Sequence, residues 1–341
     1  MRWVALSLVL ASCSFGPIFR RNFWHYFRAP EPAPHHVDDP VRDDARLAAL
    51  WIGQATVLVQ MDDKFILTDP VFAATVGRIS RRLVRPGLRP EELPFVDVCL
   101  VSHMHFDHLS LSSLDQLEGQ VGRLFAPRGG LVYIPNYDFP TDEIAPWRSV
   151  NVDGMRVTAV PVDHVGFRYG ADRWMTESYT GFVIEYNGLT VYFGGDTAYD
   201  EEKFRRTRER FPEIDLALIP IGPVTPEEMV RATHVDGPQA IQALLDIGAD
   251  AMVPIHYDTF IHGLDNRGTP SQLLLAAAEA RGVAERVHVL EVGQQAVFVA
   301  RELGSNELAE DPEEAGAQEH RGGQGQDPRE GDVAHGLHLQ P

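Results

Sequence analysis

A cluster of metal-binding side chains directly after an apolar segment constrains this chain most. The segment Phe95–Val101 is apolar at nearly every position, which is typical of a β-strand buried on both faces. The next residues, Val101–His108, read V-S-H-M-H-F-D-H, and a helix is predicted over Leu109–Gln120. The four potential metal ligands in this stretch are His103, His105, Asp107 and His108. The sequence therefore predicts a ligand cluster where a buried strand ends.

The residue types in this cluster favour a metal site over a structural role. A single histidine here would more often be a hydrogen-bonded structural residue, but three histidines and an aspartate in one loop are hard to explain that way. Alternation along an extended segment places His103, His105 and Asp107 on one side, and His108 can reach a second position. Imidazole nitrogens and a carboxylate suit zinc or another borderline divalent ion, and this many ligands can hold two ions.

Three further candidate ligands, His164, Asp196 and His256, each stand just past an apolar run. These runs are the extended segment Val150–Val160, a hairpin over residues 181–193 and the strand Ala251–Ile255. Ligands at strand ends imply one shared edge of a layered sheet fold. The ligands that we assign to a first ion are His103, His105 and His164, and those of a second ion are Asp107, His108 and His256. Asp196 is predicted to bridge both ions.

The order of these ligands resembles the pattern of the metallo-β-lactamase superfamily: H-x-H-x-D-H, a later histidine, a Gly-Asp strand end and a final histidine. The resemblance implies an α/β fold, a four-layer αβ/βα sandwich, from about Leu47 to about Val299. It is closer to the branch that contains N-acylphosphatidylethanolamine-hydrolysing phospholipase D and the ascorbate-phosphate lactonases. The stretches that carry it are Trp51–Val59, Leu67–Phe72, Leu93–Leu109, Phe193–Tyr199, Pro220–Gly222, Thr233–Pro238 and Ile255–Phe260.

Departures from related patterns bear on the substrate. The branch usually has histidine where this chain has Gln54, and Pro-Glu-Glu where it has Gly237–Gln239. Neither is a direct ligand, so metal binding is expected to survive. His105 stands where flavo-diiron relatives carry glutamate, which disfavours a redox di-iron role. Asp196 stands where true β-lactamases use cysteine or no bridging ligand, so β-lactam hydrolysis is not expected as the main activity.

The resemblance implies two-metal hydrolysis, in which a water bridging two zinc ions is acidified toward a pKa of about 7 and supplies hydroxide. The first hypothesis is a phosphodiesterase of the phospholipase D type that cleaves N-acylphosphatidylethanolamine-like lipids or small phosphodiesters. The alternatives are a lactonase or other hydrolase of a small carbonyl substrate, and a non-catalytic metal-binding scaffold. Asp107 is the candidate proton acceptor. His234 is the candidate to orient the substrate or leaving group, with a structural loop role equally open.

Three acidic residues near the ligands are candidates to support them. Asp69 ends a hairpin predicted over residues 55–68, and its carboxylate is expected either to hold a ligand or to cap the turn. Asp163 and Asp258 adjoin ligands in the sequence, so each is a candidate hydrogen-bond partner for a metal-binding histidine.

The chain divides by composition into four segments. Residues 1–13 resemble an export signal, and the end, Leu10-Ala-Ser-Cys13, is similar to a bacterial lipobox; an ordinary signal peptide or a mis-assigned start is the alternative. Residues 14–46 are Pro-rich and predicted to be a tether, with aromatic and basic residues resting on lipid as the alternative. Residues 47–302 are the predicted catalytic domain, and the acidic residues 303–341 are predicted to be disordered.

Charge and cysteine content limit the partners. A net charge of −19 disfavours nucleic acid, because phosphate binding depends on lysine and arginine. The two cysteines, Cys13 and Cys99, provide no disulfide framework and no Cys-based zinc site. If the lipobox resemblance holds, acyl chains on Cys13 anchor the protein to a membrane, and Ser14 favours the periplasmic face of an outer membrane. The sequence leaves the oligomeric state open.

Overall fold

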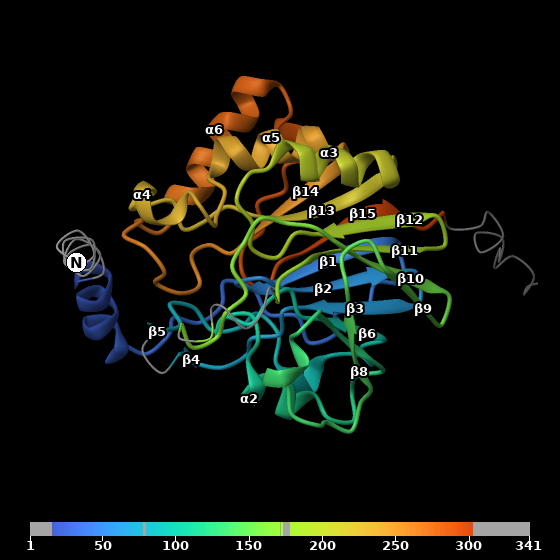
Figure 1. Cartoon of the computed structure of the whole chain (residues 1–341), viewed down its shortest axis with the longest axis horizontal. Helices are drawn as coiled ribbons and strands as arrows, with labels where there is room; N and C mark the ends of the chain where they lie inside the picture. The colour runs from blue at the N-terminus through green and yellow to red at the C-terminus, as the bar shows by residue number, and fades with distance from the viewer. Residues whose placement is uncertain (1–15, 78–79, 171, 173–177, 303–341) are drawn as a thin grey trace, which may run out of the picture. The chain divides into compact units, whose positions relative to one another are not determined.

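Two β-sheets packed face to face, with helices outside them, make up the described part of the chain (Figure 1). The computed structural model describes residues 16–77, 80–170, 172 and 178–302. The signal segment predicted at 1–13 and the disordered tail predicted at 303–341 therefore lie outside the described residues. The two sheets and their outer helices confirm the predicted four-layer αβ/βα sandwich.

The first sheet has seven strands in the order β15-β1-β2-β3-β6-β7-β8. Their bounds are β1 (Ala45–Gly53), β2 (Thr56–Met61), β3 (Lys64–Thr68), β6 (Val98–Leu100), β7 (Leu124–Pro127), β8 (Thr141–Ile144) and β15 (Gln295–Ala300). β2 and β3 form the predicted hairpin, with Leu58 opposite Leu67. From β3 to β8 the strands run parallel, so their carboxyl ends meet at one edge of the sheet.

The second sheet has six strands in the order β14-β13-β12-β11-β10-β9. Their bounds are β9 (Ser149–Val152), β10 (Met155–Val160), β11 (Gly181–Tyr186), β12 (Leu189–Phe193), β13 (Ile214–Pro220) and β14 (Ala249–Ile255). The predicted hairpin of β11 and β12 turns at Asn187 and Gly188, whose φ angles are 49° and 77°. β12, β13 and β14 are parallel, so their carboxyl ends also share an edge. β4 (Thr75–Val76) and β5 (Ser80–Arg81) form a separate pair.

Helices form the outer layers. α3 (Glu201–Arg210), α5 (Gly237–Ile247) and α6 (Thr269–Arg281) lie over the second sheet, at the top of Figure 1, and α2 (Leu111–Leu114) lies beyond the first sheet. The short helix α4 (Glu227–Val230) precedes α5. Local chemistry fixes the ends of α5: the Asp236 side chain accepts a hydrogen bond from the Gln239 backbone N–H, and Gly248 ends the helix with a left-handed conformation.

Apolar side chains form two large buried clusters. One includes Val57 from the first sheet and Phe182 from the second, and it continues to Leu244 of α5 and Leu274 of α6, the helices over the second sheet. The other lies on the outer face of the first sheet, where Leu58 and Cys99 share a cluster with Leu114 of α2. Because both faces of the central strands are covered, these strands read as nearly continuous apolar runs in the sequence.

Two predicted elements differ in the structure. The extended run predicted over Val150–Val160 is the hairpin of β9 and β10, which turns at Asp153 and Gly154, both with positive φ. The helix predicted over Leu109–Gln120 is reduced to α2 and a 3₁₀ turn. Serines at the start of this segment bond to one another, with Ser110 Oγ 2.8 Å from Ser113 Oγ, and such side chains weaken a long helix.

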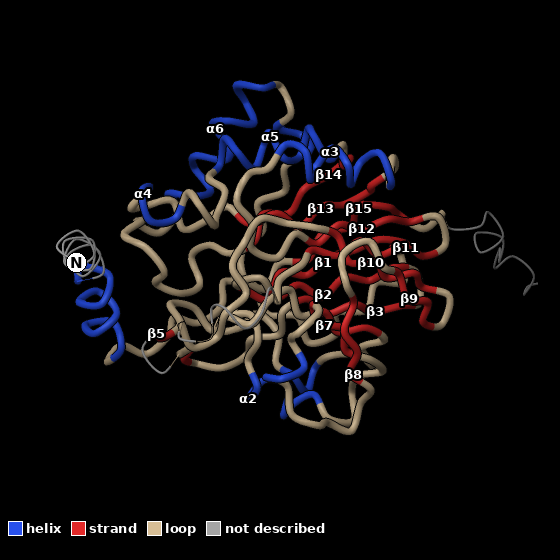
Figure 2. The backbone as a smooth tube through the Cα atoms, viewed as in Figure 1, coloured by secondary structure: helices blue, strands red, loops and turns tan. Residues whose placement is uncertain are grey.

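A helix over residues 16–26 lies within the predicted tether (blue, left, in Figure 1). The end of the two sheets that faces this helix is formed by loops, drawn in tan in Figure 2. Further along the predicted tether, the Glu31 backbone N–H donates to the Leu83 carbonyl and the His35 backbone N–H donates to the Val292 carbonyl. In the described part of the chain, no helix has both the length and the apolar character needed to cross a membrane.

Candidate metal centre

Every predicted metal ligand lies just past the carboxyl end of a strand. The loop after β6 carries His103, His105, Asp107 and His108; His164 follows β10, Asp196 follows β12 and His256 follows β14. The strands come from both sheets, so the sandwich, and not one sheet alone, assembles the cluster. Side-chain atoms of these residues form groups in which all ligand atoms lie within 4.8 Å of one another.

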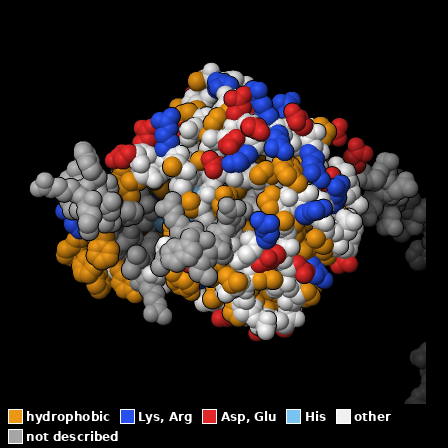
Figure 3. Space-filling view, viewed as in Figure 1, with side chains coloured by type: hydrophobic (Ala, Val, Ile, Leu, Met, Phe, Trp, Pro, Cys, Tyr) orange, Lys and Arg blue, Asp and Glu red, His pale blue; other side chains and the backbone are white. Residues whose placement is uncertain are grey.

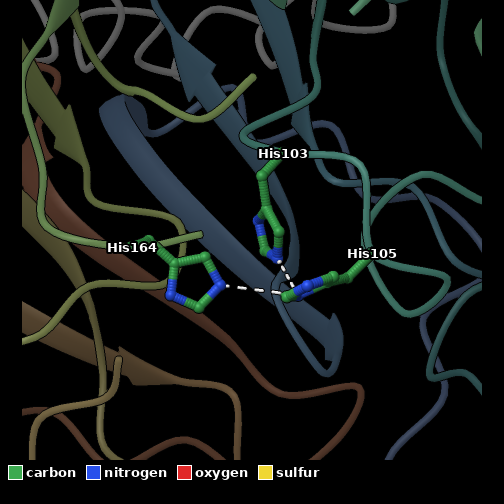
Figure 4. A group of neighbouring side chains, drawn as sticks. All are labelled: His103, His105 and His164. Carbon is green, nitrogen blue, oxygen red and sulfur yellow. Dashed lines mark hydrogen bonds between the residues drawn. The ribbon is translucent and has the colours of Figure 1, made fainter. Parts of the chain in front are cut away.

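His103, His105 and His164 form the first group (Figure 4). His103 Nε2 lies 2.9 Å from His105 Nδ1, and His164 Nε2 lies 3.4 Å from the same atom. Ligand atoms around a tetrahedral zinc ion, each about 2.0 Å from the metal, are roughly 3.3 Å apart. The three nitrogens therefore face a common point at a spacing that suits one ion.

Asp107, His108 and His256 form the second group. Asp107 Oδ2 lies 3.3 Å from His108 Nε2 and 3.1 Å from His256 Nε2. The His108 and His256 rings stack with centroids 5.0 Å apart, and both Nε2 atoms face Asp107 Oδ2. A carboxylate and two imidazoles at these distances match a second borderline divalent ion.

Asp196 stands between the two groups. Its Oδ2 atom is 3.2 Å from both His108 Nε2 and His256 Nε2, and 3.9 Å from both His103 Nε2 and His164 Nε2. One carboxylate oxygen thus faces ligand atoms of both groups. This is the placement that the bridging role predicted for Asp196 requires.

Two buried polar atoms of the cluster fit coordination to a cation. Among the described residues, His108 Nε2 and Asp196 Oδ1 are buried without a hydrogen-bond partner. An unpaired buried polar atom is costly, and a metal ion coordinated at this point removes that cost. The donor set of imidazole nitrogens and carboxylate oxygens therefore fits zinc or a similar ion.

In three of the histidines, the ring nitrogen that faces away from the cluster, Nδ1, is hydrogen-bonded to an oxygen of the surrounding chain. His108 Nδ1 donates to Asp69 Oδ2 at 2.6 Å, His164 Nδ1 to the Thr233 carbonyl at 2.9 Å and His256 Nδ1 to the Gly222 carbonyl at 2.9 Å. A hydrogen on Nδ1 leaves the Nε2 lone pair free and directed into the cluster. The surrounding chain thus selects the tautomer that can bind a metal.

Electrostatics divides the cluster into a neutral half and an acidic half. Burial lowers the pKa of His105 to about 4 and holds the pKa values of His103 and His164 well below their ordinary value, so these imidazoles are neutral at pH 7. Burial alone would also lower the pKa of His108, but the charges of Asp196, Asp107 and Asp69 raise it well above that value. The acidic half therefore favours a positive charge, which a bound cation supplies.

Asp69 supports the second ligand group from behind. It is fully buried, and its Oδ1 accepts the Ser102 backbone N–H at 2.6 Å, while Oδ2 accepts the Ser102 hydroxyl at 2.6 Å and the His108 ring N–H. Of its two predicted roles, the structure gives it the one of holding a ligand. The other two acidic candidates contact no ligand through a described hydrogen bond: Asp163 pairs with Lys203 at 3.4 Å, and Asp258 accepts the Gly268 N–H.

Two residues around Asp107 complete the site, and the sequence did not indicate this. Gln54 Nε2 donates to Asp107 Oδ2 at 2.9 Å, and His262 Nδ1 lies 3.5 Å from the same oxygen. Burial lowers the pKa of His262 to about 4, so its ring is neutral at pH 7. The sequence flagged Gln54 only as a departure from a family pattern. The available signal for His262 was a second histidine shortly after His256.

His234 reaches the cluster from the loop between α4 and α5. Its Nε2 atom lies 3.1 Å from Asp196 Oδ2, and Nδ1 lies 2.9 Å from Thr233 Oγ1. The side chain is partly exposed, whereas the metal-facing oxygen of Asp196 is buried. The structure therefore places His234 beside the ligands, and its role in orienting a substrate stays a prediction.

A family model described as "Beta-lactamase superfamily domain" matches residues 64–257 of this chain, and this range includes every predicted metal ligand. The chain belongs to this superfamily. It is 32% identical over 281 residues to an uncharacterized protein of Mycobacterium tuberculosis (strain ATCC 25618 / H37Rv), covering 76% of this chain and 72% of that protein. Over 249 residues it is 27% identical to N-acyl-phosphatidylethanolamine-hydrolyzing phospholipase D 1 of Caenorhabditis elegans, covering 68% and 69%.

More distant proteins support the same assignment. A metal-dependent hydrolase of Pyrococcus abyssi (strain GE5 / Orsay) is 26% identical over 221 residues, covering 62% of this chain and 84% of that protein. The solved structure of Igni18, a metallo hydrolase from Ignicoccus hospitalis, superimposes with a TM-score of 0.55 at 21% identity, covering 73% of this chain and 97% of that one, and shows the shared fold. The chain is a metal-dependent hydrolase of the metallo-β-lactamase superfamily.

Gly195, directly before the bridging aspartate, is expected to tolerate no side chain. Its φ is +57°, and a Cβ atom there would lie 2.3 Å from the Cβ of Ser102, whose backbone Asp69 holds. We expect Gly195→Ala to lower the free energy of unfolding by about 3 kcal/mol, from the positive φ and the overlap together. Urea unfolding of the zinc-loaded protein measures this loss.

Gly188→Ala is the matched control. Gly188 also has a positive φ, +77°, but a Cβ atom there would have nothing within 4 Å. Gly188→Ala is expected to lower the free energy of unfolding by only about 1 kcal/mol, the cost of a side chain at a positive φ without an overlap. Equal losses in the two variants would contradict a close approach of Gly195 to Ser102.

Proposed function

We propose that the chain is a dinuclear zinc phosphodiesterase of the phospholipase D type that acts on N-acylphosphatidylethanolamine-like lipids. The carrying observation is that Asp196 Oδ2 faces the ligand atoms of both metal groups, as a two-ion centre needs. The relative from Caenorhabditis elegans with the matching name supports the substrate class. A water would add to the phosphorus, the P–O bond to the N-acylethanolamine would break, and phosphatidic acid would form.

Zinc held by these residues would lower the pKa of water toward about 7 and stabilise negative charge on substrate oxygens. The residues of the chain have separate tasks. Asp107 Oδ2 would take up the proton of the attacking water, with Gln54 Nε2 donating to that oxygen and His262 Nδ1 3.5 Å from it. His234, whose Nε2 atom lies 3.1 Å from Asp196 Oδ2, would orient the phosphate or the leaving oxygen.

A pocket beside the second ligand group contains two arginine side chains. Gln54, His256 and His262 line it on the metal side, and Arg21 and Arg267 line it further out. Arginine pairs well with phosphate oxygens. The acidic residues of the lining are occupied: Asp265 accepts the Val224 backbone N–H and the Thr225 hydroxyl, and Asp258 accepts the Gly268 N–H. Both arginines also have protein partners: Arg267 pairs with Glu31, and the Arg21 guanidinium donates to the Asp265 carbonyl.

The test incubates zinc-loaded protein with N-acylphosphatidylethanolamine, with a generic phosphodiester and with a panel of lactones, and identifies the products by mass spectrometry. We expect phosphatidic acid and N-acylethanolamine from the lipid, loss of the activity after chelation, and its return with zinc. Hydrolysis of lactones without hydrolysis of either diester would replace this proposal with the small-carbonyl alternative.

A further inference from the structure

The helix over residues 16–26 packs on the rest of the protein through its polar face. Asn22 is buried, and its Nδ2 donates to the Ile261 carbonyl at 3.0 Å. His25 Nε2 lies 3.2 Å from the Arg82 carbonyl oxygen, and the Arg21 guanidinium donates to the Asp265 carbonyl. A surface helix normally turns its apolar face inward. Here the positions that face the rest of the protein are largely polar. Burial of apolar area therefore does not explain why this face of the helix packs inward.

The outward face of this segment is aromatic. Its exposed rings are Phe19 (60% exposed), Phe23 (50%), Trp24 (67%), Tyr26 (39%) and Phe27 (71%). The Phe23 ring centroid lies 5.7 Å from that of Trp24 and 5.5 Å from that of Phe27, and the Tyr26 and Phe27 centroids are 5.9 Å apart, so four of the five rings are in contact. We call the five exposed rings the aromatic patch. Figure 3 shows these hydrophobic side chains gathered at the left end of the molecule. An exposed patch of this kind marks a site that another apolar phase covers.

Unpaired positive charge borders the aromatic patch. Arg20 and Arg28 are exposed, and no ion pair joins either to a carboxylate among the described residues. Together with Trp24 they line a cavity of about 580 Å³ between the helix and the body, large enough for a lipid headgroup. Arg267, also in the lining, pairs with Glu31 at 2.6 Å, the one acidic side chain there. The net charge of the lining is positive, in a protein whose total charge is −19.

We propose that this helix docks the enzyme on a bilayer that contains anionic phospholipid. The aromatic patch enters the boundary between headgroups and acyl chains, as tryptophan and tyrosine rings do, and Arg20 and Arg28 bind lipid phosphates. Arg21 lines both this cavity and the pocket beside the metal ligands, so the docked surface adjoins the catalytic centre. The inference deepens the proposed function, because it states how a lipid substrate is presented, but vesicle binding itself requires no catalysis.

A second copy of the chain fits the aromatic patch less well than lipid does. Two helices that paired symmetrically through their aromatic faces would bring Arg20 and Arg28 of one copy close to the same residues of the other. Like charges at such a contact repel one another, whereas anionic lipid phosphates neutralise them.

The experiment uses the full chain with Cys13→Ser, so that no acyl chain can attach, loaded with zinc. Flotation measures binding to vesicles of phosphatidylcholine alone and of phosphatidylcholine mixed with phosphatidylglycerol. We expect the parent protein to bind the anionic vesicles. The double variant Trp24→Ala with Phe27→Ala is expected to bind them with about a hundredfold lower affinity, because each ring contributes about tenfold or more. Arg20→Gln and Arg28→Gln are each expected to weaken anionic binding about fivefold.

The matched control replaces two exposed apolar residues elsewhere, Phe95→Ala with Leu275→Ala, and is expected to bind like the parent protein. Hydrolysis of a water-soluble phosphodiester should be equal in all variants, so failure of the proposed activity and failure of docking are separate results. Absence of anionic vesicle binding by the parent, or undiminished binding by the Trp24 and Phe27 variant, would overturn the inference. A parent dimer in solution that this variant converts to monomer would assign the patch to a second copy instead.

Discussion

The substitution Asp107→Asn is expected to remove the second metal ion and to reduce kcat/KM by on the order of a thousandfold or more. Asp107 Oδ2 is the only carboxylate oxygen of its group besides the bridging one, and it lies 3.1 Å from His256 Nε2 and 3.3 Å from His108 Nε2. An amide oxygen is a weaker ligand and accepts no proton from water. The loss corresponds to several kcal/mol of transition-state stabilisation by the metal. Metal content per chain and steady-state kinetics measure the two effects.

Asp163→Asn is the matched control for this variant. Asp163 also follows a strand and adjoins a ligand in the sequence, but its carboxylate pairs with Lys203 on the surface. It is expected to retain both ions and the parent rate. If Asp107→Asn kept its metal content and every activity, the catalytic proposal would fail and a non-catalytic scaffold would become the better description.

Replacement of Asp69 by asparagine is expected to lower metal affinity at the second group about 10- to 100-fold. The Asp69 carboxylate accepts three hydrogen bonds, from the Ser102 N–H, the Ser102 hydroxyl and His108 Nδ1–H. An asparagine must point its NH₂ group at one of these donors. The His108 ring then loses the partner that directs Nε2 into the cluster, and a buried donor is left unpaired at a cost of about 1–3 kcal/mol. Zinc titration with a competing chelator measures the affinity.

Asp97→Asn separates a general loss of stability from an effect on the metal. Asp97 accepts the Phe65 backbone N–H at 2.9 Å and Lys64 Nζ at 3.0 Å, so its replacement also costs a backbone and a side-chain hydrogen bond. It contacts none of the ligands through a described hydrogen bond. We expect lower stability to urea and unchanged zinc affinity. A parallel decrease of zinc affinity in both variants would contradict a specific role of Asp69.

Short-range patterns predicted much of the fold. The hairpins of β2 with β3 and of β11 with β12 lie where the sequence predicted them. Failures were also local in origin. The Asp153-Gly154 turn signal divides the run 150–160 into two strands, and serine side chains shorten the helix after His108. In each case a turn or side-chain hydrogen bond competed with the hydrophobic pattern and prevailed.

The helix over residues 16–26 shows a different limit. The sequence indicated aromatic and basic residues in this segment but not which of them face the body. That choice depends on carbonyl groups far along the chain. The Ile261 carbonyl accepts a hydrogen bond from Asn22, and the Arg82 carbonyl lies 3.2 Å from His25 Nε2. Hydrophobicity alone would have turned the same helix the other way.

By itself, the sequence determined the kind of site and its position: ligand residues of defined chemistry at strand ends, where backbone direction brings them to one edge. Only the tertiary structure decided what surrounds them. Asp69, Gln54 and His262 meet the ligands across separations of 39, 53 and 155 residues, and Asp196 lies between two groups drawn from both sheets. Such contacts form because the sandwich closes around its apolar core, and side-chain distances between remote segments are set by that packing rather than by any local pattern.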